Sequence, residues 1–191
     1  MSSKPRLAHP PSVGPERNIR NLTLIGFMGT GKTTVGHMVA AQLHFDFVDT
    51  DHLIEARSGL AISEIFAQQG ESAFRVLEGS VIDELARRQG TVFATGGGVG
   101  ANPTHLASLK THSLVICLWA SAEVICERVQ HQTHRPLLQV SAPLEHVRRL
   151  LAEREPIYRQ ADVLINTGSR QLREVAAQVI HQYHTAVGFP A

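Results

Sequence analysis

The eight residues from Gly26 to Thr33 constrain this chain more than any other segment. They read Gly-Phe-Met-Gly-Thr-Gly-Lys-Thr and match the pattern GxxxxGK followed by Ser or Thr. A short apolar run precedes them, and apolar residues at helical spacing follow. In that setting glycines let backbone N–H groups surround a phosphate, and the helix N-terminus adds partial positive charge. Because the lysine, the threonine and both flanking patterns are present, we predict a phosphate-binding loop (P-loop) rather than a plain glycine-rich turn.

Two side chains of this loop suit a nucleotide and its metal. Lys32 can reach the β- and γ-phosphates of ATP, and the Thr33 hydroxyl can ligate Mg²⁺. The loop backbone and the first turn of the following helix supply the other contacts. The predicted ATP-binding residues of this region are Gly29, Thr30, Gly31, Lys32, Thr33 and Thr34. We therefore predict ATP as a substrate and Mg²⁺ as the metal cofactor.

Short apolar runs and helical patterns alternate along the rest of the chain. The runs are residues 21–26, 45–49, 91–95, 114–119 and 163–165, and a segment with helical spacing follows each of them. This alternation predicts an α/β fold, a parallel sheet with helices on both faces. In such sheets ligands collect at the carboxyl ends of the strands.

Length and charge narrow the class of protein. The 191 residues suit one domain with a buried core. Residues 1–18 contain four prolines and few apolar side chains, so we expect a disordered tail before a domain that spans residues 19–191. The net charge is +1, from 18 basic and 17 acidic residues. This balance argues against nucleic acid or a membrane surface as a partner.

The cellular compartment is predicted from what the sequence lacks. No stretch approaches the roughly 20 apolar residues of a membrane span, and the N-terminus has no signal-peptide pattern. The two cysteines, Cys117 and Cys126, have neither metal-site spacing nor the number needed for a disulfide framework. We therefore expect reduced thiols and a cytoplasmic location. We also expect the protein to act as a monomer.

Only the second predicted strand delivers carboxylates at its end. P-loop proteins need an acidic group near the metal, and residues 94–96 and 118–120 contain none. Asp49 and Asp51 follow the second strand, and alternation in an extended segment would place them on the same side. We expect one carboxylate near Mg²⁺ and the other near the hydroxyl to be phosphorylated. A compatible alternative is that Asp51 caps a helix that begins at His52.

Three arginines and a triple glycine indicate the acceptor. Arg75 lies in a predicted helix and Arg154 in the segment Glu153-Arg-Glu-Pro-Ile-Tyr158, whereas Arg135 precedes a proline, where helix is disfavoured. Residues 130–142 are polar and break helical periodicity, so we predict a mobile lid that brings Arg135 to the transferred phosphoryl group. Residues 96–98 end a strand with bare backbone, which suits the close approach of a small polar substrate. Each arginine alone could be a solvated surface residue, but the joint pattern indicates a kinase of a small, anionic, hydroxylated molecule.

In their order along the chain, these motifs resemble those of the shikimate kinases, which have a nucleoside-monophosphate-kinase-like fold. The resemblance covers residues 21–184 and is specific because it combines several motifs. They are residues 26–33, Asp49-Thr-Asp51, Gly70-Glu-Ser-Ala-Phe-Arg75, Thr95-Gly-Gly-Gly98, Arg135-Pro-Leu-Leu138 and Arg154-Glu-Pro-Ile-Tyr158-Arg159. It implies the strand order 2-3-1-4-5 and ATP-dependent phosphorylation of the shikimate 3-hydroxyl, in chorismate and aromatic amino-acid biosynthesis.

The resemblance also implies roles on the nucleotide side. Lys32 and Thr33 would serve ATP and Mg²⁺, and Asp49 would hold the metal through water. Arg128 would stack on adenine. Arg135 would be the lid residue that reaches both the phosphate and the substrate.

On the acceptor side, the resemblance assigns five residues. Asp51 would contact the shikimate hydroxyls and take or orient the 3-hydroxyl proton, so that it joins Lys32 and Arg135 as a catalytic residue. Arg75 and Arg154 would hold the carboxylate, a task that suits the forked donors of arginine. Gly97 and Gly98 would donate backbone N–H groups to the substrate.

Three other interpretations compete with this one. The nearest is another small-molecule P-loop kinase, such as a gluconate kinase, which gives no reason for Asp51, Arg75 and Arg154 to occur together. A non-catalytic, kinase-like regulator would be favoured by the loss of Lys32, Asp51 or Arg135, and all three are present. A nucleic-acid-dependent ATPase is disfavoured by the balanced charge and the small size.

Overall fold

The computed structural model describes residues 17–130 and 142–188 of the chain. Within them, five strands form one parallel sheet in the order β2-β3-β1-β4-β5. The strands are β1 (Asn21–Ile25), β2 (Asp46–Asp49), β3 (Thr91–Ala94), β4 (Ser113–Trp119) and β5 (Val163–Asn166). The predicted α/β class, the five strands and their order are confirmed.

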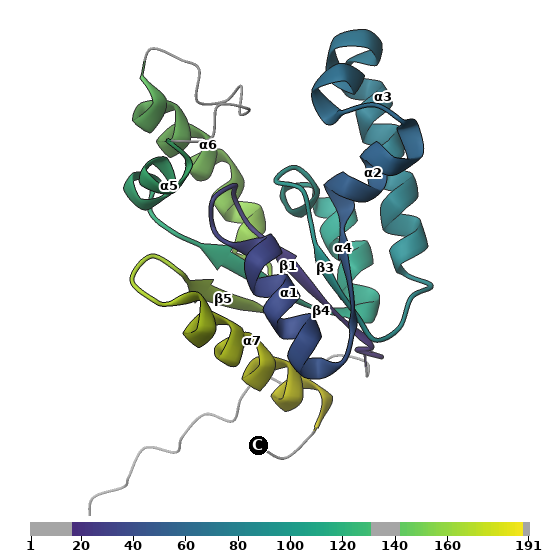
Figure 1. The fold of residues 1–191 in the computed structure, drawn as a ribbon, viewed down its shortest axis with the longest axis vertical. Helices are drawn as coiled ribbons and strands as arrows, with labels where there is room; N and C mark the ends of the chain where they lie inside the picture. Colours follow the sequence, from purple (N-terminus) through teal and green to yellow (C-terminus); the bar gives the residue numbers. More distant parts are fainter. Residues whose placement is uncertain (1–16, 131–141, 189–191) are drawn as a thin grey trace, which may run out of the picture.

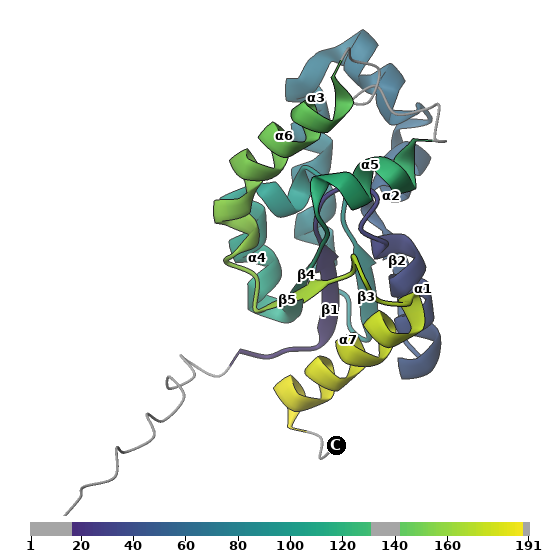
Figure 2. The ribbon, with the colours of Figure 1, turned by 90° about the vertical axis from the view of Figure 1, so that its left-hand side faces the viewer.

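Helices cover both faces of this sheet. Helices α1 (Lys32–Leu43) and α7 (Leu172–Val187) pack on one face (Figure 1). The other face carries α3 (Ile62–Leu85), α4 (Pro103–His112), α5 (Ala122–Val129) and α6 (Pro143–Tyr158), as the turned view in Figure 2 shows. Helix α2 (Thr50–Ser58) and the 3₁₀ turn η1 (Val99–Ala101) come after β2 and β3, at the carboxyl ends of these strands.

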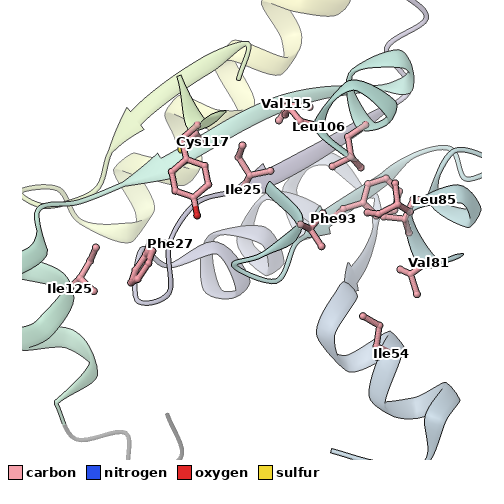
Figure 3. Packing of buried hydrophobic residues seen from close by; sticks show 14 of the residues in the cluster. Ile25, Phe27, Ile54, Val81, Leu85, Phe93, Leu106, Val115, Cys117 and Ile125 are labelled. Atoms are coloured by element: carbon pink, nitrogen blue, oxygen red, sulfur yellow. The ribbon is translucent and has the colours of Figure 1, made fainter. Parts of the chain in front are cut away.

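The two faces of the sheet bury separate apolar clusters. Along β4, Val115 and Cys117 belong to the cluster under α3 to α6, and Leu114 and Ile116 belong to the cluster under α1 and α7. Figure 3 shows the first cluster, where Val115 and Cys117 lie beside Ile25 of β1. Because both faces are covered, the inner strands β1, β3 and β4 are buried along nearly their whole length and read as largely apolar runs, whereas the edge strands β2 and β5 are only partly buried. That is why apolar runs located the strands in the sequence.

Helix α3 is interrupted at Gly70, which divides it into two helical segments. Gly70 has φ 79° and ψ 174°, which is not helical. Its positive φ is a conformation that glycine adopts without steric cost. The interruption separates the segment that buries Ile65 from the segment that carries Arg75.

Arg17 fastens the start of the described chain to the edge of the sheet. Its guanidinium contacts both carboxylate oxygens of Asp162 at 2.6 and 2.9 Å and donates to the Ser113 carbonyl oxygen at 2.6 Å. Burial would raise the pKa of Asp162, but the hydrogen bond from Arg17 lowers it overall.

Most of the predicted tail, residues 1–16, and most of the predicted lid, residues 131–141, lie outside the described residues. Within the two described ranges, no helix is long and apolar enough to cross a membrane.

Candidate active site

The P-loop follows β1 and requires glycine at three positions. Gly26, Gly29 and Gly31 have φ values of 134°, 75° and 94°, a region that side-chain-bearing residues rarely adopt. A Cβ at Gly26 would also lie 2.0 Å from the carbonyl oxygen of Leu118 on β4. A Cβ at Gly29 would lie 2.8 Å from Cγ1 of Val129 on α5. The glycine pattern therefore follows from the backbone path and from close packing against two neighbouring elements.

Lys32 begins α1 and folds back over the loop. Its Nζ donates to the carbonyl oxygens of Gly26 and Phe27 at 2.9 and 3.0 Å. Helix α1 has no side-chain cap at Gly31 and no acidic residue in its first turn. The N–H groups of that turn are therefore suited to an anion. The buried hydroxyl of Thr30 donates to the Phe27 carbonyl oxygen at 2.8 Å, so Thr30 can face a nucleotide only through its backbone.

Thr33 and Asp49 bring a hydroxyl and a carboxylate together. Thr33 Oγ1 donates to Asp49 Oδ2 at 3.0 Å, and Asp49 Oδ1 accepts the backbone N–H of Asp51 at 3.1 Å. Asp49 is thus the N-cap of α2, which begins at Thr50. Two sequence-based expectations are wrong: Asp51 is not extended alongside Asp49, and it does not cap a helix that begins at His52. The helix starts earlier because the Asp49 carboxylate satisfies an N–H of its first turn.

Asp51 lies in the first turn of α2 against the loop that follows β3. A Cβ at Gly96 would lie 2.1 Å from Asp51 Oδ1, so only glycine leaves room for this carboxylate. The buried Thr50 hydroxyl accepts the Gly96 N–H at 2.9 Å and holds the loop in place. Burial and the neighbouring Asp49 raise the pKa of Asp51 to about 6, although Lys32 lowers it. A carboxyl group with a pKa near neutrality suits proton exchange with a hydroxyl.

Each glycine of the triplet after β3 meets a different functional side chain. Gly96 packs against the carboxylate described above. A Cβ at Gly97 would lie 3.4 Å from Nη1 of Arg154, and a Cβ at Gly98 would lie 2.5 Å from Nη1 of Arg75. None of the three has a positive φ. The short Cβ distances at Gly96 and Gly98 favour glycine through space rather than backbone conformation, whereas a Cβ at Gly97 would make an ordinary contact.

Both arginines line one cavity of about 360 Å³. Its lining residues are Arg75, Gly98, Ala101, Asn102, Pro103 and Arg154. The volume lies at the lower end of the range of roughly 300–1,000 Å³ for small-molecule sites. Two guanidinium groups in one cavity favour an anionic ligand. The structure thus brings together three of the predicted acceptor-binding residues, and their ligand roles stay predictions.

Arg75 is held by two carboxylates of its own helix. Its Nη1 contacts Glu78 Oε2 at 2.9 Å, and its Nη2 contacts Glu71 Oε1 at 2.9 Å. Glu78 is only 1% exposed, and its other oxygen has no hydrogen-bond partner among the described residues. Desolvation would lower the pKa of the Arg75 guanidinium, but the hydrogen bonds to Glu78 and Glu71 raise it overall. The buried Glu78 therefore sets the direction in which Arg75 points.

Arg154, on α6, contacts the P-loop as well as the cavity. Its guanidinium carbon lies 5.0 Å from the centroid of the Phe27 ring, within the range of a cation–π interaction. Its Nη1 also donates to the Gly97 carbonyl oxygen at 3.1 Å. The carbonyl oxygen of Phe27 accepts from Lys32. Phe27 therefore joins the P-loop to the cavity that Arg154 lines.

Arg128, in the last turn of α5, lies beside the P-loop. It donates to the Gly29 carbonyl oxygen at 3.3 Å, to Thr167 Oγ1 at 3.0 Å and to the Thr167 carbonyl oxygen at 2.6 Å. Arg128 thus connects the P-loop to the segment after β5, and its stacking on adenine stays a prediction. Thr34 is exposed in the first turn of α1. Arg135 lies outside the described residues.

Sequence reasoning missed three residues that shape this site: Thr50, Glu78 and Phe27. Glu78 comes three residues after Arg75, a spacing that places both on one face of a helix. That spacing could have identified it. Thr50 and Phe27 act on residues far away in the chain, so no local spacing marks them.

Asp51 is the point at which the two halves of the site meet. Lys32 of the P-loop acts on its pKa, and Gly96 of the acceptor-side loop touches its carboxylate. The P-loop and the loop after β3 thus meet at one carboxyl group with a raised pKa. A kinase that phosphorylates a small anionic molecule has this arrangement, and the fold and the site together define a P-loop kinase.

Comparison with known proteins shows which family of P-loop kinases this chain resembles. The shikimate kinase family model matches residues 28–184. The chain is 46% identical to the shikimate kinase of Caldanaerobacter subterraneus subsp. tengcongensis over 165 residues, which cover 86% of this chain and 96% of the relative. It is 47% identical to the shikimate kinase of Thermodesulfovibrio yellowstonii, which covers 86% of this chain and 95% of that protein. This chain belongs to the shikimate kinase family.

Solved structures agree with this assignment. The shikimate kinase from Acinetobacter baumannii in complex with shikimate has a TM-score of 0.82 and 37% identity, over 88% of this chain and 95% of that chain. A gluconokinase from Sinorhizobium meliloti has a TM-score of 0.58 and 16% identity. The second likeness is one of fold alone.

Proposed function

We propose that this protein transfers the γ-phosphoryl group of ATP to the 3-hydroxyl of shikimate, giving shikimate 3-phosphate and ADP. The observation that carries the proposal is the convergence of Arg75 and Arg154 on one cavity in a member of the shikimate kinase family. Shikimate offers one carboxylate for these guanidinium groups and hydroxyls for Asp51. Gluconate offers the same groups, but the likeness to a gluconokinase extends only to the fold.

The acceptor is held by charge and by bare backbone. Arg75 and Arg154 each offer a fork of N–H donors that matches a carboxylate. The pairing with the buried Glu78 directs Arg75 before any ligand arrives. Gly97 and Gly98 carry no side chain that could cover the main chain, so the substrate can approach the backbone here; a Cβ at Gly98 would lie 2.5 Å from Arg75 Nη1.

Asp51 is the proposed general base. Its pKa of about 6 leaves the carboxyl group mostly ionised at neutral pH and basic enough to take the hydroxyl proton as the new P–O bond forms. Lys32, now on the loop carbonyl oxygens, is the cation that would turn to the β- and γ-phosphates. There it would offset the charge that develops on the transferred group.

The residues at the P-loop fit a magnesium ion bound with ATP. The Thr33 hydroxyl and the Asp49 carboxylate meet at 3.0 Å, and both are the oxygen ligands that Mg²⁺ prefers. In the described part of the chain, no group of three His, Cys, Asp or Glu residues suits a metal. Mg²⁺ needs no such cage, because it is held by one or two protein groups, nucleotide phosphates and water. Thr33 would bind it directly and Asp49 through water; bound there, the ion would neutralise phosphate charge.

A substrate panel tests the proposal. ADP release, coupled to an indicator reaction, should be fast with shikimate and slow with quinate or gluconate, and Lys32→Ala protein should give the background rate. Faster release with gluconate than with shikimate would assign the site to the competing kinase class.

We also propose that the enzyme acts as a monomer, since the P-loop and both cavity arginines come from one chain; light scattering tests this. A cytoplasmic location stays a prediction.

A further inference from the structure

Tyr158 has a buried hydroxyl beside the acceptor cavity and has no role in the proposed phosphoryl transfer. It is the last residue of α6, four residues after Arg154, so both side chains lie on one face of the helix. The side chain is 5% exposed. Its Oη donates to the carbonyl oxygen of Gly97 at 3.3 Å.

The Gly97 carbonyl oxygen therefore accepts two hydrogen bonds from α6. The second comes from Arg154 Nη1 at 3.1 Å. The Arg154 side chain also lies close enough to the phenol to act on its pKa. Burial raises the pKa of Tyr158 to about 12, although Arg154 lowers it, so the hydroxyl stays protonated and can donate at neutral pH. Phenol and guanidinium thus meet at one carbonyl oxygen.

The direction of the Gly97 carbonyl also determines the direction of the next amide. In a trans peptide the C=O and the following N–H point in opposite directions, so the Gly98 N–H points away from Tyr158. Gly98 lines the cavity. Its N–H makes no hydrogen bond to any residue in the ranges 17–130 and 142–188, which leaves it to donate to a ligand.

We propose that Tyr158 is a positioning residue of the acceptor site. Its hydroxyl fixes the Gly97 carbonyl, to which the Arg154 guanidinium also donates, and so keeps Arg154 and Gly98 in place at the lining of one cavity. The proposal rests on the acceptor site assigned above. It adds a residue that would not touch the substrate and yet would set its affinity.

Tyr158→Phe removes only the oxygen atom and tests the proposal. Shikimate binding, measured by calorimetry, should weaken about fivefold, which is ~1 kcal/mol at 1.4 kcal/mol per tenfold. The KM for ATP should stay within about twofold, since no nucleotide contact changes. A purely structural role would lower the melting temperature and leave the affinity of the folded protein for shikimate unchanged.

Tyr183→Phe is the matched control. Tyr183 is the only other tyrosine of the chain, is 7% exposed, and packs against Phe45 on the opposite face of the sheet. Removal of its hydroxyl should leave shikimate affinity unchanged. Arg154→Ala distinguishes a failure of the Tyr158 proposal from a failure of the acceptor assignment. If Arg154→Ala weakens shikimate binding and Tyr158→Phe does not, the inference on Tyr158 is overturned; if neither weakens it, the acceptor assignment itself is wrong.

A second measurement decides the matter if Tyr158→Phe does not fold. The full-length wild-type chain labelled with 3-fluorotyrosine gives two ¹⁹F signals, which Tyr183→Phe assigns. Saturating shikimate should move the Tyr158 signal and leave the Tyr183 signal in place. A Tyr158 signal that does not respond to shikimate overturns the proposal.

Discussion

Replacement of Asp51 by asparagine is expected to stabilise the fold while it removes most of the activity. The native state raises the pKa of this carboxyl group from 3.8 to about 6, chiefly by burial. Each pKa unit corresponds to about 1.4 kcal/mol, so the ionised carboxylate costs the native state roughly 3 kcal/mol. Asp51→Asn removes this cost, but the gain in stability is smaller than about 3 kcal/mol for two reasons. Solvent still reaches the carboxyl group in the wild type, and the asparagine amide is itself polar. We expect a net stabilisation of about 1–2 kcal/mol, or a few degrees in Tm.

The expected stabilisation by Asp51→Asn depends on pH. Above pH 6, Asp51 is ionised in both the folded and the unfolded state, and the full cost of burying the charge is present. Between pH 6 and pH 3.8 the folded state takes up a proton first, so the cost fades as the pH falls. The advantage of Asp51→Asn should therefore be largest at pH 8 and much smaller at pH 4.5.

Urea unfolding of both proteins at pH 8 and pH 4.5 measures the difference. Asp83→Asn is the control, because Asp83 is exposed on α3 and its replacement should change little at either pH. In parallel, kcat should fall by roughly 10²–10⁴-fold, the scale of a lost general base. A variant no more stable than the wild type at pH 8, or equally stabilised at both pH values, would refute the reasoning about the buried charge.

Four further predictions concern other parts of the molecule. Lys32→Ala should lower kcat by several orders of magnitude and leave the fold intact, as steady-state kinetics and circular dichroism would show. Arg154→Ala should weaken shikimate binding by about 2–5 kcal/mol and leave ATP binding nearly unchanged, because one partner of a partly buried charge pair is lost; calorimetry with each ligand tests this. Arg135→Ala should lower kcat more than it weakens either ligand, since the predicted contact strengthens as charge develops; equal effects on kcat and binding would contradict that role. Burial, with a smaller effect from Arg20, lowers the pKa of His112 below 6.5. The stability that the neutral His112 contributes should therefore be lost as the pH falls below 6.5, because the unfolded chain takes up the proton first. Urea unfolding of the Asp51→Asn variant between pH 7.5 and 5.5 measures this loss without the opposing titration of Asp51.

The sequence by itself determined the class of fold and the phosphate-binding loop. Both depend on rules that operate over a few residues. A strand buried on both faces must be an apolar run, and the path of the P-loop requires positive φ at Gly26, Gly29 and Gly31, which glycine adopts at little cost. The strand order came instead from the resemblance to a family, because alternation of strands and helices does not specify which strands are neighbours.

The tertiary structure alone decided how the acceptor side is built. Alternation along an extended chain misplaced Asp51, because the Asp49 cap starts α2 directly after β2. The triple glycine indicated bare backbone, but its three separate neighbours, Asp51, Arg154 and Arg75, come from three different helices. The contacts of Arg154 with Phe27 and of Tyr158 with Gly97 likewise join distant parts of the chain. Such contacts depend on how helices pack against the sheet, and packing is a property of the whole core that no short pattern records.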